Sequence, residues 1–184
     1  RRHRHTPMKT HHGVNGAGGR MGRRIIDLAH AAPDITLAAA LESPDHPLLG
    51  RDIGEEVGVG ALGLPVVAEL PLATRLDVLI DFSTPEGTMA VLPVCTERRI
   101  PLVVATTGHT AAQKREIEAA AHETALLVAP NMSLAVNVLM KLVGDAAALL
   151  RDRGFDVEIV EKHHRFKKDS PSGTALHFAR IVQE

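Results

Sequence analysis

The chain has 184 residues, 45% of them hydrophobic and 23% charged, with a formal net charge of -1. This balance is typical of a soluble globular protein and argues against a largely disordered chain, while the small charge gives no general attraction to nucleic acid or anionic membranes. Trp and Tyr are absent, so the chain also lacks the aromatic platforms on which bases stack. We therefore expect no nucleic-acid partner and, because no apolar run approaches roughly 20 residues, no membrane partner.

The single cysteine, Cys95, excludes an internal disulfide framework and favours a reducing compartment. The basic start of the chain, residues 1–7, contains no apolar segment and so does not resemble a secretory signal. From these two features we expect a cytoplasmic protein.

Short β-branched runs alternate with longer helical patterns over residues 8–130, which is typical of an α/β fold with a Rossmann-like, doubly wound parallel sheet. The first strand, around Val14, is a poor one, because His11, His12 and Gly13 stand where apolar residues are expected. Gly and Pro punctuate residues 43–63 too often for a long element. The remaining predicted strands are residues 35–41, 66–67, 78–82, 102–104 and 126–128. Helices are predicted at residues 19–30 and 110–122. A further helix is predicted to begin at Pro85, with Ser83 or Thr84 as its cap.

A long amphipathic helix, residues 132–150, breaks this rhythm and places a domain boundary near Asn131. We expect a dinucleotide-binding domain over residues 8–130 and the beginning of a second, α+β domain over residues 131–184. Within the second domain the pattern predicts a strand at residues 157–160 and a helix at residues 174–182, with Asp169 or Ser170 as its cap. A domain ending at that helix would bury little of its own surface, so we expect the chain to be incomplete.

Four glycines, Gly16, Gly18, Gly19 and Gly22, lie between the first strand and the first helix. A pyrophosphate needs backbone N–H groups within hydrogen-bond distance, and side chains at these positions would block its approach. The helix that follows adds its positive dipole end, and Arg20 adds a full charge. The alternative is a glycine-rich tight turn that binds no ligand.

Glu42 ends the second strand about 20 residues beyond the last of these glycines, where a carboxylate can accept hydrogen bonds from an adenosine ribose. Ser43 follows it instead of a basic residue that would neutralise a 2′-phosphate, so local chemistry favours NADH over NADPH. Two alternatives stay open. Glu42 can be a solvated charge at a strand end, and four arginines can reach the site with compensating charge: Arg20, Arg23, Arg24 and Arg51.

A second candidate site occupies residues 161–174, where two His, one Arg and two Lys precede the last predicted helix. Cations beside a helix N terminus can bind a carboxylate, and a histidine with a lysine four residues later can deliver a proton. Hydride plus proton is the sum of a nicotinamide reduction. A solvated basic turn is the alternative, and we expect no metal site, because the adjacent His163 and His164 point in different directions and no cysteine is near.

The run Glu-Lys-His-His-Arg-Phe-Lys-Lys-Asp-Ser-Pro-Ser-Gly-Thr-Ala, which begins at Glu161, resembles the signature of the 4-hydroxy-tetrahydrodipicolinate reductase family. Four other segments resemble that family in the same order, so the resemblance covers nearly the whole chain from Met8. They are the glycine loop, the run Asp-Phe-Ser-Thr-Pro-Glu-Gly at residues 81–87, Ala-Thr-Thr-Gly at residues 105–108 and Ala-Pro-Asn-Met-Ser at residues 129–133.

The resemblance implies a role for each matching position. It implies that His163 donates or accepts a proton, that Lys167 donates one, and that His164, Gly173 and Thr174 bind the substrate and its carboxylate. It implies that the cofactor phosphates contact Gly16, Ala17, Gly18, Gly19, Arg20 and Met21, that Glu42 contacts the ribose, and that the nicotinamide side is lined by Ala105, Thr106, Thr107, Ala129, Pro130, Asn131 and Met132.

The resemblance also implies the reduction of a small cyclic dicarboxylate, 4-hydroxy-tetrahydrodipicolinate, by NADH or NADPH in lysine and diaminopimelate biosynthesis, and a homotetramer in the full-length form. The chain departs from the family pattern at residues 11–13 and at Ser170, and the family continues beyond the last helix. Two alternatives remain: another Rossmann-type dehydrogenase of a small amino or imino dicarboxylate, and a truncated chain that binds nucleotide without activity.

Overall fold

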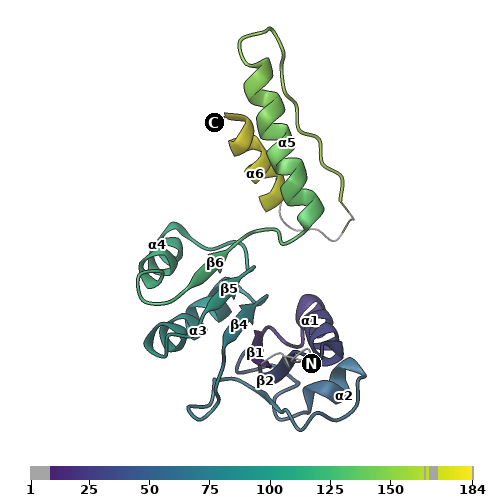
Figure 1. The fold of residues 1–184 in the computed structure, drawn as a ribbon, viewed down its shortest axis with the longest axis vertical. Coiled ribbons are helices and arrows are strands. Elements are labelled where there is room, and N and C mark those ends of the chain that lie inside the picture. The colour runs from purple at the N-terminus through teal and green to yellow at the C-terminus, as the bar shows by residue number, and fades with distance from the viewer. Residues whose placement is uncertain (1–8, 164, 166–169, 184) are drawn as a thin grey trace, which may run out of the picture. The chain divides into compact units, whose positions relative to one another are not determined.

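The computed structural model describes residues 9–163, 165 and 170–183 of the chain. These residues form two compact units, Arg1–Val128 and Ala129–Glu184, drawn in Figure 1. Each unit has its own secondary structure and packing, so each is taken in turn. None of the helices in the described ranges is long and apolar enough to cross a membrane.

The first unit contains a six-stranded sheet in the order β3-β2-β1-β4-β5-β6, and every pair of neighbouring strands is parallel. The chain winds outward from β1 to β3 and then returns to the centre to wind outward from β4 to β6. The switch point of this doubly wound sheet therefore lies between β1 and β4, which confirms the predicted fold class. The strands are β1 (Thr10–Asn15), β2 (Ile35–Leu41), β3 (Val66–Val67), β4 (Val78–Asp81), β5 (Leu102–Val104) and β6 (Leu126–Val128).

Helices cover the two faces of this sheet, as Figure 1 shows, and each face has its own apolar core. The alternation of side chains along β2 serves both cores, because Ala40 packs on one face while Ala39 and Leu41 pack on the other. Ile26 lies in the same core as Ala40, and Cys95 lies in the same core as Leu41. The helices in the described residues of this unit are α1 (Arg20–Ala31), α2 (Ile53–Val57), α3 (Pro85–Glu97) and α4 (Ala111–Ala120).

Side-chain caps fix where the helices begin. Thr84, not Ser83, caps α3, since its side chain accepts a hydrogen bond from the Gly87 N–H at 3.1 Å and Pro85 occupies the first helical position. The sequence pattern did not indicate the five-residue helix α2. Asp52 holds this helix and the loop after it, accepting hydrogen bonds from the N–H groups of Gly54, Glu55, Leu62 and Leu64.

Strand β1 forms in full despite its poor apolar pattern. At its start, the backbone N–H of His11 donates to Asp77 Oδ2 at 2.7 Å, and His11 Nδ1 lies 3.1 Å from the same oxygen. Gly13 is required by packing, because a Cβ there would lie 2.7 Å from Leu79 Cδ1. Burial lowers the pKa of His12, which lies half-buried in the strand.

The second unit contains α5 (Leu134–Leu150) and α6 (Gly173–Gln183), which pack against each other. Their approach is close at Gly144, where a Cβ would lie 3.0 Å from Ile181 Cγ2. The predicted strand at residues 157–160 is wrong, since that segment is irregular. A strand needs a partner for its backbone groups, and the described residues of this unit form no other strand with which it could pair. The predicted cap of α6 is also corrected: Ser172 Oγ accepts the Ala175 N–H at 3.1 Å.

Candidate functional site

The glycine loop turns tightly at the carboxyl end of β1. The N–H groups of Gly16 and Ala17 both donate to Leu41 O at 3.0 Å, and the Gly19 N–H donates to Gly16 O at 3.1 Å. Gly16 has a φ of +78°, and a Cβ there would lie 2.5 Å from Phe82 O. Gly16 is therefore fixed both by its backbone conformation and by the backbone packed against it.

The loop leads into the N terminus of α1, which no side chain caps. Gly19 occupies the cap position and has no side chain to offer the first N–H groups of the helix. Gly22, in the first turn, is buried, and a Cβ there would lie 2.1 Å from Gly16 O. Helix and loop thus lie in direct backbone contact, beside exposed Arg20 and Met21. This arrangement fits a pyrophosphate, because it combines unpaired N–H groups with the positive end of a helix dipole.

Glu42 lies at the carboxyl end of β2 and contacts the glycine loop directly. Its Oε1 accepts the Gly18 N–H at 2.8 Å, and its Oε2 accepts the Ser43 N–H at 3.2 Å. His46 lies close to Glu42, with its Nε2 4.0 Å from Glu42 Oε2. Its Nδ1 accepts a hydrogen bond from the Leu48 N–H at 3.3 Å. The carboxylate predicted to meet a ribose is thus held beside the loop and is only 11% exposed.

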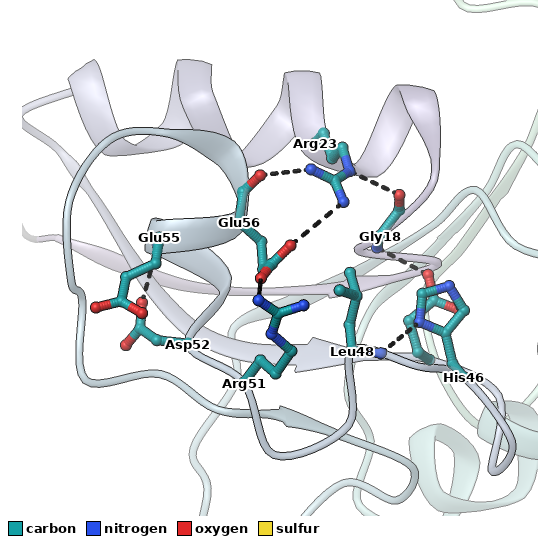
Figure 2. A network of polar contacts seen from close by, with 9 residues as sticks. Gly18, Arg23, His46, Leu48, Arg51, Asp52, Glu55 and Glu56 are labelled. Atoms are coloured by element: carbon teal, nitrogen blue, oxygen red, sulfur yellow. Dashed lines mark hydrogen bonds and ion pairs between the residues drawn. The ribbon is translucent and has the colours of Figure 1, made fainter.

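Three of the four arginines that the sequence offered as compensating charge have carboxylate partners within the first unit. Arg24 NH1 lies 2.5 Å from Asp27 Oδ2, and Arg51 NH2 lies 2.8 Å from Glu56 Oε1. Arg23 also contacts Glu56 and, in addition, the glycine loop (Figure 2). These pairings leave less free positive charge around Glu42 than the sequence count indicates.

A buried carboxylate lies at the switch point, where the sequence pattern indicates no role for it beyond its place in a family motif. Asp81 ends β4, is fully buried and accepts five hydrogen bonds. Two of these hydrogen bonds come from Ser83, two residues later in the sequence, which donates through its N–H at 3.2 Å and its hydroxyl at 2.5 Å. The other three bring in distant segments: Asn15 Nδ2 at 2.9 Å, Thr88 Oγ1 at 2.5 Å and Thr106 Oγ1 at 2.9 Å. We call these five residues the Asp81 cluster.

The segment after β5, predicted to line the nicotinamide side, is anchored by this cluster. The Ala105 N–H donates to Asp81 O at 3.0 Å, and the Thr106 hydroxyl accepts the Ser83 N–H at 3.0 Å in addition to donating to Asp81. Thr106 is 9% exposed, so its hydroxyl serves the protein interior. Thr107 is exposed and carries the side chain of this segment that can meet a ligand.

In the second unit, Glu161 joins His163 to the start of α6. Its Oε2 lies 2.8 Å from His163 Nε2, and its Oε1 accepts the Ser172 N–H at 2.8 Å. The side-chain and backbone hydrogen bonds of Ser172, together with that of His163, lower the pKa of Glu161 to about 2. Glu161 opens the family motif, but nothing in the sequence pattern assigned it this contact.

The structure also brings Asn131 and Thr174 together, 43 residues apart in sequence. Asn131 Nδ2 lies 3.4 Å from Thr174 Oγ1, while Asn131 Oδ1 accepts the Ser133 N–H at 2.8 Å near the start of α5. Ala129, Pro130 and Met132 lie in the same segment of this unit, and Gly173 is the first residue of α6.

The candidate residues therefore form two groups, one in each unit. The glycine loop, Glu42 and the segment after β5 belong to the first, and His163, Asn131 and the start of α6 belong to the second. Two predicted residues, His164 and Lys167, lie outside the described part of the chain.

Comparison with known proteins gives matches over both units. Residues 10–132 match a family model described as dihydrodipicolinate reductase, N-terminus, and residues 135–184 match one described as dihydrodipicolinate reductase, C-terminus. The 4-hydroxy-tetrahydrodipicolinate reductases of Methylococcus capsulatus and Magnetococcus marinus are 46% and 43% identical to this chain over 171 and 173 residues. These alignments cover 92% and 94% of the chain but only 63% and 64% of the relatives, so the chain spans just under two thirds of their length.

A solved structure shares the fold. The dipicolinate-bound dihydrodipicolinate reductase from Paenisporosarcina sp. TG-14 superposes with a TM-score of 0.70 at 28% sequence identity. The superposition covers 95% of this chain and 66% of that one.

Proposed function

The chain belongs to the dihydrodipicolinate reductase family, and from this premise we propose that it takes part in the NADH- or NADPH-dependent reduction of 4-hydroxy-tetrahydrodipicolinate to tetrahydrodipicolinate. The membership confirms the resemblance seen in the sequence. We also propose a role in lysine and diaminopimelate biosynthesis, a cytoplasmic location and a homotetramer of full-length subunits.

The observation that carries the cofactor half of this proposal is the open N terminus of α1. Gly16 and Gly22 leave no room for a Cβ, and the cap residue Gly19 offers no side chain to the first N–H groups. These features fit the phosphates of a dinucleotide, which would meet residues 16–21, with Glu42 at the ribose. Bound there, the nicotinamide supplies a hydride.

The chain's own groups would handle the carboxylates and the proton. The N terminus of α6, with Gly173 and Thr174, offers N–H groups and a hydroxyl to a substrate carboxylate. His163, oriented by Glu161 through a 2.8 Å contact, is the proposed proton donor. The small cyclic dicarboxylate named for the solved relative is of the same chemical type as this substrate. His164 and Lys167 keep the roles implied by the family motif, as substrate ligand and second proton donor.

The decisive experiment follows the oxidation of NADH in the presence of 4-hydroxy-tetrahydrodipicolinate, with oxaloacetate plus ammonia as the comparison substrate. We expect turnover of the cyclic substrate alone. His163→Ala should lower kcat by roughly 100-fold while leaving NADH affinity unchanged, as for loss of a general acid. His122→Ala, which removes an exposed histidine in the turn after α4, is the matched control. Turnover only of oxaloacetate plus ammonia would refute the assignment, and NADH binding without any turnover would refute its catalytic half.

For the cofactor itself we propose a preference for NADH. Glu42 places a carboxylate beside the loop, and a 2′-phosphate would be repelled by it, while Arg23, Arg24 and Arg51 already have carboxylate partners. Glu42→Arg should therefore raise the ratio of kcat/KM for NADPH to that for NADH by roughly tenfold or more, which is about 1.4 kcal/mol. An unchanged ratio would mean that Glu42 does not lie at the ribose.

A further inference from the structure

The connection between β2 and β3 is ordered around one carboxylate. Asp52 accepts four backbone N–H groups, two at the start of α2 and two from Leu62 and Leu64 beyond it, at 2.8 to 3.3 Å. These bonds, that of Leu62 foremost, lower the pKa of Asp52. Gly54 packs so closely that a Cβ there would lie 2.2 Å from Gly60 O. This segment therefore holds α2, and with it Glu56, in a defined place.

Glu56 receives two guanidinium groups. Arg23 NH1 donates to the Glu56 carbonyl, and Arg23 NH2 lies 3.7 Å from Glu56 Oε2. On the other carboxylate oxygen, Arg51 NH2 lies 2.8 Å from Oε1. The Glu56 side chain is 16% exposed, whereas that of Arg51 is 61% exposed. The Arg23 side chain is less exposed than that of Arg51, at 40%, and its contact with Glu56 joins α2 to α1 (Figure 2).

The third nitrogen of the Arg23 guanidinium reaches the glycine loop. Its Nε donates to Gly18 O at 2.9 Å (Figure 2). The Gly18 N–H in turn donates to Glu42 Oε1 at 2.8 Å. Glycine has little intrinsic preference for one backbone conformation, so a glycine in such a loop changes its φ and ψ easily unless both its N–H and its carbonyl are bound. With its carbonyl bound to Arg23, Gly18 cannot turn that oxygen toward a bound phosphate, where it would be repelled.

From this geometry we propose that Arg23 is a positioning residue for the cofactor site, held by Glu56, and that it keeps the glycine loop in the conformation that binds the dinucleotide phosphates. The inference rests on the proposed function, because it requires that the loop binds a dinucleotide. Arg23 acts through Gly18 and need not touch the cofactor. A site already ordered in its bound conformation binds more tightly, since less conformational freedom is lost on binding.

The test is a titration of NADH followed by its own fluorescence, which the chain, lacking Trp and Tyr, does not obscure. Arg23→Ala should raise the Kd of NADH, and its KM in the reductase assay, by about tenfold while leaving kcat at saturating NADH unchanged. Glu56→Gln removes the charge but keeps the backbone carbonyl, so about a threefold rise is expected. Arg23→Lys, which keeps a charge but cannot reach both acceptors as a guanidinium does, should lie between the two.

Arg24→Ala is the matched control, since Arg24 is the next residue on α1 and pairs with exposed Asp27 away from the loop. It should leave the Kd of NADH unchanged. A wild-type Kd in Arg23→Ala, or a lower kcat with an unchanged Kd, would overturn the positioning role. Should Arg23→Ala fail to fold, Arg23→Lys decides, and a wild-type Kd there would equally overturn it. If the wild-type chain itself bound no NADH, the proposed cofactor site would fall, and this inference with it.

Discussion

Replacing Asp81 with asparagine tests whether the switch point of the sheet depends on a buried negative charge. The substitution keeps the shape of the side chain but converts one acceptor oxygen into an amide donor. All five groups around Asp81 donate to it, so the new amide must face donors on either side. The better placement turns it toward Thr88 and Thr106, since hydroxyl groups can rotate and accept instead.

The cost follows from counting these bonds. Two hydrogen bonds to a charged acceptor are lost, each worth about 1.5–3 kcal/mol, and reversed bonds of about 1 kcal/mol each replace them. Thr88 retains a second acceptor, Thr84 O at 3.2 Å, but the reversed Thr106 hydroxyl needs a new one. Relief of the burial of a charge offsets part of the loss. The net destabilisation should be about 2–3 kcal/mol, which for a unit of this size lowers Tm by roughly 8–10 °C.

Thermal unfolding of Asp81→Asn should be followed by far-UV circular dichroism at neutral pH, because the chain has no Trp or Tyr for fluorescence. Asp27→Asn is the matched control, since Asp27 is an exposed partner of Arg24, and such surface pairs contribute about 0–1 kcal/mol. A fall in Tm for Asp81→Asn no larger than that of the control would refute the reasoning, because the five donors would then not require a carboxylate.

Three further predictions concern other parts of the chain. Gly22→Ala gains about 1 kcal/mol of helix propensity but places a Cβ 2.1 Å from Gly16 O, so the glycine loop must move. We therefore expect NADH to bind at least about tenfold more weakly, and an unchanged Kd would show that the loop accommodates the Cβ without losing its binding conformation. Burial lowers the pKa of His12, so its unfavourable contribution to the free energy of unfolding is absent above the unfolded pKa of about 6.5 and grows as pH falls below it. The free energy of unfolding of His12→Val should therefore depend less on pH than that of the wild type between about pH 7.5 and 5.5, and equal slopes would contradict this. The hydrogen bonds of Ser172 and His163 lower the pKa of Glu161 to about 2, so its stabilising contribution is present above the unfolded value of about 4.5 and is lost as pH falls toward 2. The Glu161 carboxyl resonance should titrate accordingly, and a midpoint near 4.5 would mean that the contacts with Ser172 and His163 do not form in solution.

Local patterns in the sequence were enough for most of the first unit. The buried strands at residues 78–82 and 102–104 and the Thr-Pro start of α3 are set by neighbours a few residues away, and these predictions are confirmed. The predicted strand at residues 157–160 is wrong for the opposite reason. Its apolar pattern is real, but a strand forms only with a partner, and pairing is not encoded within the segment itself. Helix α2 was missed because Leu62 and Leu64, which bind its cap Asp52, lie beyond its end.

Around the glycine loop, the types of charged residue in the sequence do not determine which charges pair with one another. The sequence places Arg23 and Arg51 near a cofactor site and indicates positive charge that could serve a 2′-phosphate. In the folded chain both guanidinium groups bind Glu56, a residue to which the sequence pattern gave no role. The local potential thus depends on which charges pair, and that depends on where Asp52 places α2. The same pairing turns Arg23 toward Gly18. An arginine that the sequence offered as compensating charge for a 2′-phosphate is therefore proposed to act on the loop that would hold the dinucleotide pyrophosphate.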